Sequence, residues 1–236
     1  MSQDRSMAVF DWFSNQFGIE GRAGFVEQVR PLLASLIRPG HRVLDLCCGA
    51  GGVTFALEEM GARVTAIDLA AGLIDLAREE TASRGSTIEF IHGDVLTYPL
   101  GEGTYDLVTC FGNAVLDFPP GDFPHFRDKV RRALKPGGYF AFQYRDGVLR
   151  LMAMSDPANV TEEGAEGRIE RRFLRYDPER GAFLSHYRHL ATGTVHEGVS
   201  YIYTGPLLRA FMTPSFRLEQ TLRLSEVSFL DLFLRN

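Results

Sequence analysis

The sequence is short of cysteine, of lysine and of long apolar runs, and each shortage excludes a class of protein. Its 3 cysteines, Cys47, Cys48 and Cys110, form no C-x-x-C pair, so neither a disulfide framework nor a zinc site is indicated. We therefore expect no metal, and a reducing, cytoplasmic location. No apolar run approaches the roughly 20 residues that span a bilayer, so we expect no membrane partner.

Positive charge is also in short supply. The chain has 25 basic and 30 acidic residues, a net charge of −5, and only Lys129 and Lys135 are lysines. Proteins whose main partner is nucleic acid carry an excess of basic residues, so we expect no nucleic-acid partner. The hydrophobic share of 45% is ample for a buried core, and 236 residues fit one enlarged domain.

Short apolar runs alternate with amphipathic helical stretches through residues 41–145. Strands that alternate with helices form a parallel sheet with helices on both faces, and right-handed crossovers make it doubly wound. The expected fold class is therefore α/β, with a Rossmann-like, doubly wound, mostly parallel sheet of seven strands. Five of these strands are expected at 42–47, 63–69, 87–92, 106–111 and 139–144, and the last two at 216–222 and 226–233.

The pattern changes after residue 145. Three expected strands, at 168–176, 183–192 and 197–203, follow one another without a helix, which implies an antiparallel insertion after the fifth strand. The weakly periodic stretch 147–167 is expected to be irregular or helical. We divide the single domain into an N-terminal helical lid, a cofactor-binding core, the insertion, and a closing helix with two strands, at 1–40, 41–145, 146–204 and 205–236.

A glycine-rich segment, DLCCGAGG, lies between the first expected strand and the next helix. Doubly wound sheets bind ligands at this edge, where glycines let backbone amides approach closely. A dinucleotide and S-adenosylmethionine (AdoMet) are the two candidate ligands. The dinucleotide fingerprint would run Gly49-x-Gly51-x-x-Thr54, with threonine in place of the third small residue. AdoMet suits the segment better, because Asp45 heads a run of small residues.

Two further acidic residues follow expected strands. Asp68 ends the second strand, where a carboxylate can accept both ribose hydroxyls of an adenosine, and Asp94 follows the third, where it can accept an adenine amino group. The carboxyl ends of parallel strands meet at one edge of a sheet. We therefore expect Asp45, Asp68 and Asp94 to lie along one crevice.

The set of motifs resembles the class I AdoMet-dependent methyltransferases. It consists of VLDLCCGAGG, VTAIDLA, IHGDVL, YDLVTCFGNAV and LKPGGYFAF. The resemblance implies AdoMet as cofactor and S-adenosylhomocysteine as product. It also implies that Asp45, Gly49 and Gly51 lie around the methionine moiety and Asp68 at the ribose. Asp94 and Val95 would lie at the adenine, and Phe111 with Asn113 beside the sulfonium. Cys47 and Leu69 complete the cofactor-binding candidates. Cys47 stands where the family usually has glycine, and we do not expect it to be catalytic.

The insertion makes the chain look like the small-molecule branch of that family, loosely like the glycine and sarcosine N-methyltransferases. This likeness implies transfer of a methyl group to N or O of a small-molecule acceptor by in-line displacement. The candidate substrate residues are Phe17, Tyr144 and Arg145, and Arg145 could clamp a carboxylate through its planar guanidinium. No catalytic base is assigned.

Two alternatives stay open: an RNA or protein methyltransferase, and a non-catalytic AdoMet-binding regulatory protein. The first would carry an Asn/Asp-Pro-Pro-Tyr/Phe motif after the fourth strand, and Phe111-Gly112-Asn113-Ala114 lacks its prolines. Nothing in the sequence degrades the cofactor site, which disfavours the second.

The insertion is rich in arginine. Strand alternation spreads these side chains over both sheet faces, so we expect a solvated sheet or a subunit contact, with a homodimer as one option for assembly. The six arginines are Arg168, Arg171, Arg172, Arg175, Arg180 and Arg188.

Overall fold

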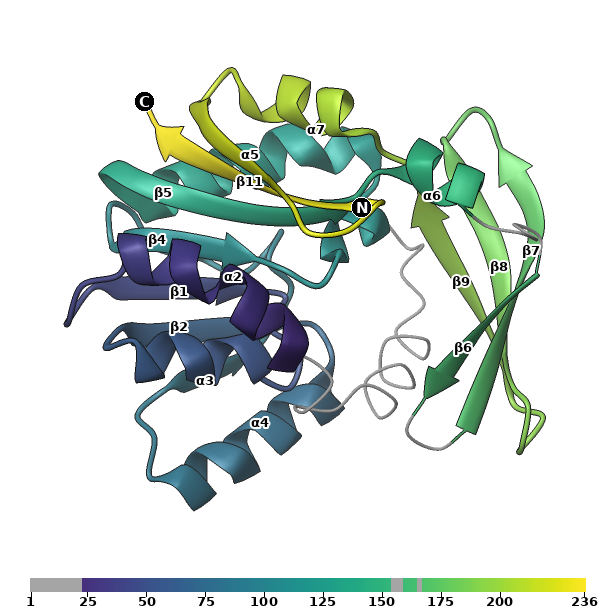
Figure 1. Ribbon diagram of the computed structural model, residues 1–236, viewed down its shortest axis with the longest axis horizontal. Coiled ribbons are helices and arrows are strands. Elements are labelled where there is room, and N and C mark those ends of the chain that lie inside the picture. Colours follow the sequence, from purple (N-terminus) through teal and green to yellow (C-terminus); the bar gives the residue numbers. More distant parts are fainter. Residues whose placement is uncertain (1–22, 154–158, 165–166) are drawn as a thin grey trace.

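The computed structural model describes residues 23–153, 159–164 and 167–236. Phe17 and most of the expected N-terminal lid lie outside the described residues. The described chain forms two sheets, one of seven strands and one of four (Figure 1).

The seven-stranded sheet has the order β10-β11-β5-β4-β1-β2-β3. The five strands β1 to β5 are parallel, whereas β11 runs antiparallel to both β5 and β10. The expected mostly parallel, Rossmann-like sheet is thus confirmed. Its strands are β1 (Arg42–Leu46), β2 (Arg63–Asp68), β3 (Glu89–His92), β4 (Tyr105–Cys110), β5 (Leu134–Arg145), β10 (Phe216–Arg223) and β11 (Ser228–Arg235).

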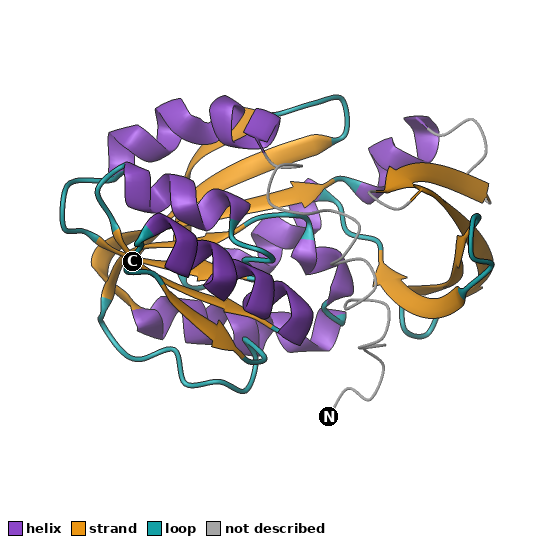
Figure 2. Cartoon of the chain, turned by 90° about the horizontal axis from the view of Figure 1, so that it is seen from below, coloured by secondary structure: helices purple, strands orange, loops and turns teal. Residues whose placement is uncertain are grey.

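Helices cover both faces of this sheet (Figure 2). One hydrophobic cluster packs the sheet against α5 and α7, and a second packs it against α2, α3 and α4. Neighbouring residues of β1 divide between the clusters, because Leu44 belongs to the first and Val43 to the second. The helices are α2 (Ala23–Leu36), α3 (Gly52–Glu59), α4 (Ala71–Arg84), α5 (Phe123–Ala133) and α7 (Gly205–Met212), with short 3-10 turns η2 (Ala114–Asp117) and η3 (Pro120–Asp122).

The second sheet lies beyond the carboxyl ends of the parallel strands (Figure 1). It is antiparallel throughout and has the order β6-β7-β8-β9. Its strands are β6 (Asn159–Gly164), β7 (Gly167–Asp177), β8 (Ala182–His189) and β9 (Val195–Tyr201), and α6 (Gly147–Ala153) precedes them.

The expectation of an irregular or helical stretch at 147–167 is met by α6 and is wrong for β6. The sequence of β6, NVTEEG, is poor in strand-forming residues apart from Val160 and Thr161. Its pairing with β7 in continuous register supplies what its own propensity lacks.

Asp146 holds both ends of the insertion together. Its Oδ1 accepts hydrogen bonds from the amides of Val148 and Leu149 at the start of α6, and its Oδ2 accepts one from the amide of Gly205. Next to it, the amide of Gly147 donates to the carbonyl of Tyr203 at 2.7 Å. The four-stranded sheet is therefore fixed at the end of β5, beside the carboxyl edge of the main sheet.

Candidate functional site

The loop after β1 runs along the edge where the strand order reverses, between β1 and β4. Three of its residues adopt positive φ: Cys47 at 55°, Gly49 at 58° and Gly51 at 86°. Gly51 precedes α3 and is tightly enclosed, since a Cβ there would lie 2.8 Å from Cζ of Phe90. A Cβ on Gly49 would meet only Cδ1 of Leu73, at an ordinary 3.6 Å.

Asp68 connects this loop to the end of β2. Its Oδ2 accepts the amide hydrogen of Gly49 at 2.8 Å, and its Oδ1 accepts that of Ala70 at 2.9 Å. Burial raises the pKa of Asp68 above its ordinary value, although these backbone N–H groups act in the opposite direction. A carboxylate has about four acceptor positions, so both oxygens keep room for a further donor such as a ribose hydroxyl.

Asp45 is engaged inside the protein. It is 2% exposed, and its two carboxylate oxygens accept hydrogen bonds from the hydroxyls of Thr54 and Thr109, at 2.6 and 2.7 Å. These bonds join β1 to the first turn of α3 and to β4. Thr54 is the residue that departs from the dinucleotide fingerprint, and in the structure its hydroxyl donates to Asp45.

Asp94 and Val95 follow β3 on the same edge. Oδ1 of Asp94 accepts the amide hydrogen of Leu96 at 2.9 Å, which stabilises the turn, while Val95 is buried at 3% exposure. Asp94 itself is half-buried. The three aspartates thus lie at the carboxyl ends of the neighbouring strands β1, β2 and β3, with Asp45 in the interior and Asp68 and Asp94 nearer the surface.

Phe111 and Asn113 follow β4. Phe111 is buried and packs edge-to-face on Phe25 of α2, with the ring centroids 5.4 Å apart. Asn113 has a φ of 63°, and its Oδ1 is buried without a hydrogen-bond partner in the described chain. Gln143 of β5 fixes the loop between them, because its Oε1 accepts the amide hydrogen of Gly112 at 2.7 Å.

An orphaned buried amide oxygen is rare in folded proteins. The Asn113 oxygen, the spare acceptor positions of Asp68 and the open face of Gly49 therefore fit a ligand that brings both hydroxyl and amino donors. AdoMet has both, so the residues present fit this cofactor.

The cysteines beside the loop are protonated at neutral pH. A hydrogen bond with Cys110 raises the pKa of the Cys47 thiol well above its ordinary value, and burial adds to the effect. Burial likewise raises the pKa of Cys48, helped by the negative charge of Asp68. Only the thiolate is a strong nucleophile, so neither thiol is suited to nucleophilic catalysis.

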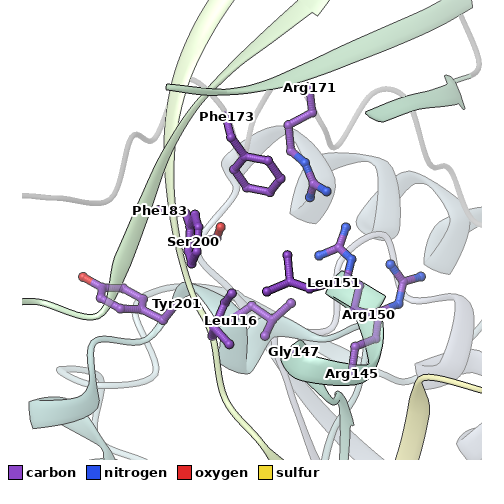
Figure 3. Close-up of a pocket in the computed structure, with 11 residues that line it drawn as sticks. Leu116, Arg145, Gly147, Arg150, Leu151, Arg171, Phe173, Phe183, Ser200 and Tyr201 are labelled. Atoms are coloured by element: carbon purple, nitrogen blue, oxygen red, sulfur yellow. The ribbon is translucent and has the colours of Figure 1, made fainter. Parts of the chain in front are cut away.

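The two described candidates for substrate binding lie in different places. Tyr144 is 1% exposed, its ring stacks on Phe229, and its hydroxyl accepts a hydrogen bond from Arg209 at 3.0 Å. Arg145, the next residue on β5, lines a pocket between α6 and the four-stranded sheet (Figure 3). Its neighbour Asp146 is occupied by α6 and Gly205 rather than by Arg145.

This pocket contains residues that sequence reasoning missed. Arg171 was expected on a solvated or subunit surface, yet it is 6% exposed and faces into the pocket. The sequence does carry a signal, because Arg171 alternates in step with Ile169 and Phe173, which also turn inward. The pocket is lined by Leu116, Arg145, Gly147, Arg150, Leu151, Arg171, Phe173, Phe183, Ser200, Tyr201 and Ile202.

Residues 43–138 match a family model described as a methyltransferase domain. This match assigns residues 43–138 to a methyltransferase domain. AdoMet is the cofactor of this domain, which agrees with the donors and acceptors along the crevice. Among the described residues no helix is long and apolar enough to cross a bilayer, and no group of three His, Cys, Asp or Glu is placed to hold a metal ion.

Relatives agree with this assignment. A demethylmenaquinone methyltransferase of Staphylococcus aureus is 33% identical over 105 residues, which is 43% of this chain and 42% of that relative. The chain thus aligns with less than half the length of this curated relative.

Two solved structures share the fold. The PH0226 protein of Pyrococcus horikoshii is 24% identical, with a TM-score of 0.73 and coverage of 92% of each chain. An AdoMet-bound amino pentose methyltransferase of Micromonospora echinaspora is 19% identical, with a TM-score of 0.67 and coverage of 90% of this chain and 91% of that one.

Proposed function

We propose that this protein is an enzyme that transfers a methyl group from AdoMet to N or O of a small-molecule acceptor, with S-adenosylhomocysteine as the product. One observation carries the proposal: the crevice and the pocket meet at a single turn. The amide of Leu116, which lines the pocket, donates to the carbonyl of Asn113, which belongs to the crevice, at 3.0 Å. An acceptor in the pocket would therefore lie next to the cofactor.

Bound AdoMet would supply a methyl group already activated by the positive sulfonium, so the chain's own residues need only bind, orient and exclude water. Asp68 would hold the ribose, and Asp94 with Val95 the adenine. Asp45 would act by positioning the loop that carries Gly49. Phe111 and Asn113 would exclude water from the reacting atoms, because the Phe111 side chain and the Oδ1 of Asn113 are buried. We assign no catalytic base.

A small acceptor is favoured over RNA or a protein. The pocket lining includes the apolar side chains of Leu116, Phe173 and Phe183, which suits a compact, partly apolar molecule. The turn after β4, Phe111-Gly112-Asn113-Ala114, lacks the two adjacent prolines that an amino-group methyltransferase of RNA or protein would carry. Two relatives are named for a quinone and for an amino sugar, both of them small molecules.

The test is a screen with AdoMet labelled in its methyl group. The purified protein would be incubated with amines, carboxylates, phenols and sugars, and S-adenosylhomocysteine would be measured by mass spectrometry. We expect S-adenosylhomocysteine to form in step with a labelled product for at least one small acceptor. Tight AdoMet binding without turnover on any acceptor would instead support a regulatory protein, and turnover only on RNA or protein would overturn the small-molecule assignment.

A further inference from the structure

The pocket beside the cofactor crevice carries an unusual concentration of positive charge. Three arginines from three elements line it: Arg145 at the end of β5, Arg150 on α6 and Arg171 on β7 (Figure 3). We propose that this pocket binds an oxyanion, a carboxylate or a phosphate, carried by the methyl acceptor on an apolar body. This inference rests on the proposed function and names the acceptor class for the same site.

Arg171 supplies the strongest reason. It is only 6% exposed, and its Nε and Nη2 atoms are buried without a hydrogen-bond partner in the described chain. Its guanidinium interacts with the hydroxyl of Tyr187 and lies 4.8 Å from the ring centroid of Phe173. A buried guanidinium that leaves two donor atoms unpaired is strongly destabilising unless a counter-charge binds there.

Arg145 adds a second guanidinium to the same side of the pocket (Figure 3). The acidic residue next to it, Asp146, uses both carboxylate oxygens on backbone amides at the two ends of the insertion. Among the side chains that the structure describes, those of 24–153, 161 and 167–236, Arg145 forms no ion pair. The fork of an arginine is well matched to two oxygens of a carboxylate or phosphate.

Arg150 brings the third positive charge, and its guanidinium points toward that of Arg171 (Figure 3). Like charges that converge in a partly buried pocket repel each other. Asp117 of η2 acts electrostatically on Tyr187, so one carboxylate lies in the same region. The case for an anion therefore rests on Arg171 and Arg145, and Arg150 adds positive potential to the same pocket.

The rest of the pocket sets the shape of the ligand. Phe173, Phe183, Leu116 and Leu151 form its apolar lining. Leu116 is hydrogen-bonded through its backbone to Asn113, beside the crevice. A ligand whose anionic group contacts the arginines would thus lay its apolar body toward the cofactor, with the methyl-accepting atom at the end far from the oxyanion.

Calorimetric titration tests the pocket directly. The full-length protein, loaded with S-adenosylhomocysteine, would be titrated with 4-hydroxyphenylacetate, its neutral amide 4-hydroxyphenylacetamide, phenyl phosphate and inorganic phosphate. The variants would be Arg171→Gln and Arg145→Gln. Arg172→Gln is the matched control, because Arg172 is the next residue on β7 and is exposed. The phosphate arm separates affinity for an oxyanion alone from affinity for the whole aryl acid.

We expect at least one of the three anions to bind wild type and the Arg172→Gln control equally. Arg171→Gln should weaken that binding about 10- to 100-fold, because charge-assisted hydrogen bonds are lost. The neutral amide should bind to the wild type about as weakly as the anion binds to Arg171→Gln. Arg171→Gln should also raise the urea midpoint of the ligand-free protein, because it removes an uncompensated buried charge, whereas a purely structural arginine would lower it.

The inference is overturned if no anion binds better than the amide, or if Arg171→Gln binds anions as wild type does. That result leaves the methyltransferase proposal intact, provided that AdoMet still binds and is turned over. Conversely, failure of AdoMet to bind would sink the proposed function, while the phosphate titration, repeated on unloaded protein, would still report on the pocket.

Discussion

Two glycines in the loop after β1 should respond differently to substitution by alanine: Gly51 through the stability of the fold, and Gly49 through affinity for the cofactor. Gly51 has a φ of 86°, and an added Cβ would lie 2.8 Å from Phe90 and 3.0 Å from Phe55. Left-handed backbone costs a non-glycine residue about 1–2 kcal/mol, and overpacking a core costs about 1–3 kcal/mol. Gly51→Ala should therefore lower the free energy of unfolding by roughly 2–5 kcal/mol.

Gly49 has a φ of 58° and room for a methyl group, since its nearest neighbour would be Leu73 at 3.6 Å. Gly49→Ala should cost only about 1 kcal/mol of stability, because a smaller unfolded-state entropy offsets part of the strain. Its effect should fall on the cofactor. A methyl group on the open side of the loop would keep the backbone away from AdoMet and weaken binding at least about 10-fold.

The control is Gly85→Ala, at the end of α4. Gly85 has a φ of 61°, close to that of Gly49, and nothing lies within 4 Å of the position of its Cβ. Urea unfolding of the ligand-free proteins and calorimetric titration with AdoMet measure the two effects separately. The reasoning would be refuted if Gly49→Ala bound AdoMet as tightly as Gly85→Ala does, or if Gly51→Ala were as stable as Gly85→Ala.

Three further predictions concern the framework around the site. Asp231 is fully buried and paired with Arg209 at 2.8 Å, so Arg209→Met should lower the free energy of urea unfolding by about 3–5 kcal/mol; a loss under 1 kcal/mol would contradict this. Burial alone would raise the pKa of Asp106, but hydrogen bonds from the Lys135 side chain and a backbone amide lower it overall. The Lys135–Asp106 ion pair should therefore stabilise the protein at pH 7, where Lys135→Met should lower the free energy of unfolding by under about 1 kcal/mol. This difference should shrink as the pH falls below about 4 through the lowered pKa of Asp106; a difference that grew in acid would count against it. Ellman's reagent at pH 7 should modify Cys47 more slowly in the folded than in the urea-unfolded protein, and the reverse order would argue for an activated thiolate.

Much of the main sheet could be predicted because buried parallel strands are nearly continuous apolar runs. The expected strand at 42–47 is one residue longer than β1 at its C-terminal end, and the one at 106–111 is shifted by one residue from β4 at both ends. The start of β5 was placed at Tyr139, five residues later than Leu134. Leu134 pairs with Tyr105, and the register then shifts so that Tyr139 pairs with Leu107. Such an irregularity depends on the neighbouring strand and leaves no periodic trace.

The cofactor side was easier to predict than the acceptor side. The glycine loop, Asp68 and Asp94 follow strands, so their position in the sequence fixes their position in space. The acceptor pocket is assembled from the end of β5, η2, α6 and three strands of the second sheet. The alternation of Ile169, Arg171 and Phe173 places these side chains on one face of β7. That this face lines the acceptor pocket depends on how the second sheet curves and docks, which the sequence pattern does not show.

Calorimetric titration of AdoMet into Asp68→Ala and Asp68→Asn tests the central claim most directly. Asp75→Ala is the control, since Asp75 is an exposed acid on α4 that forms an exposed ion pair with Arg78. Because hydrogen bonds to a carboxylate are lost, both Asp68 variants should bind AdoMet at least about 10-fold more weakly, whereas the control should bind it as the wild type does. Unchanged affinity in the Asp68 variants would contradict the assignment of this crevice to AdoMet.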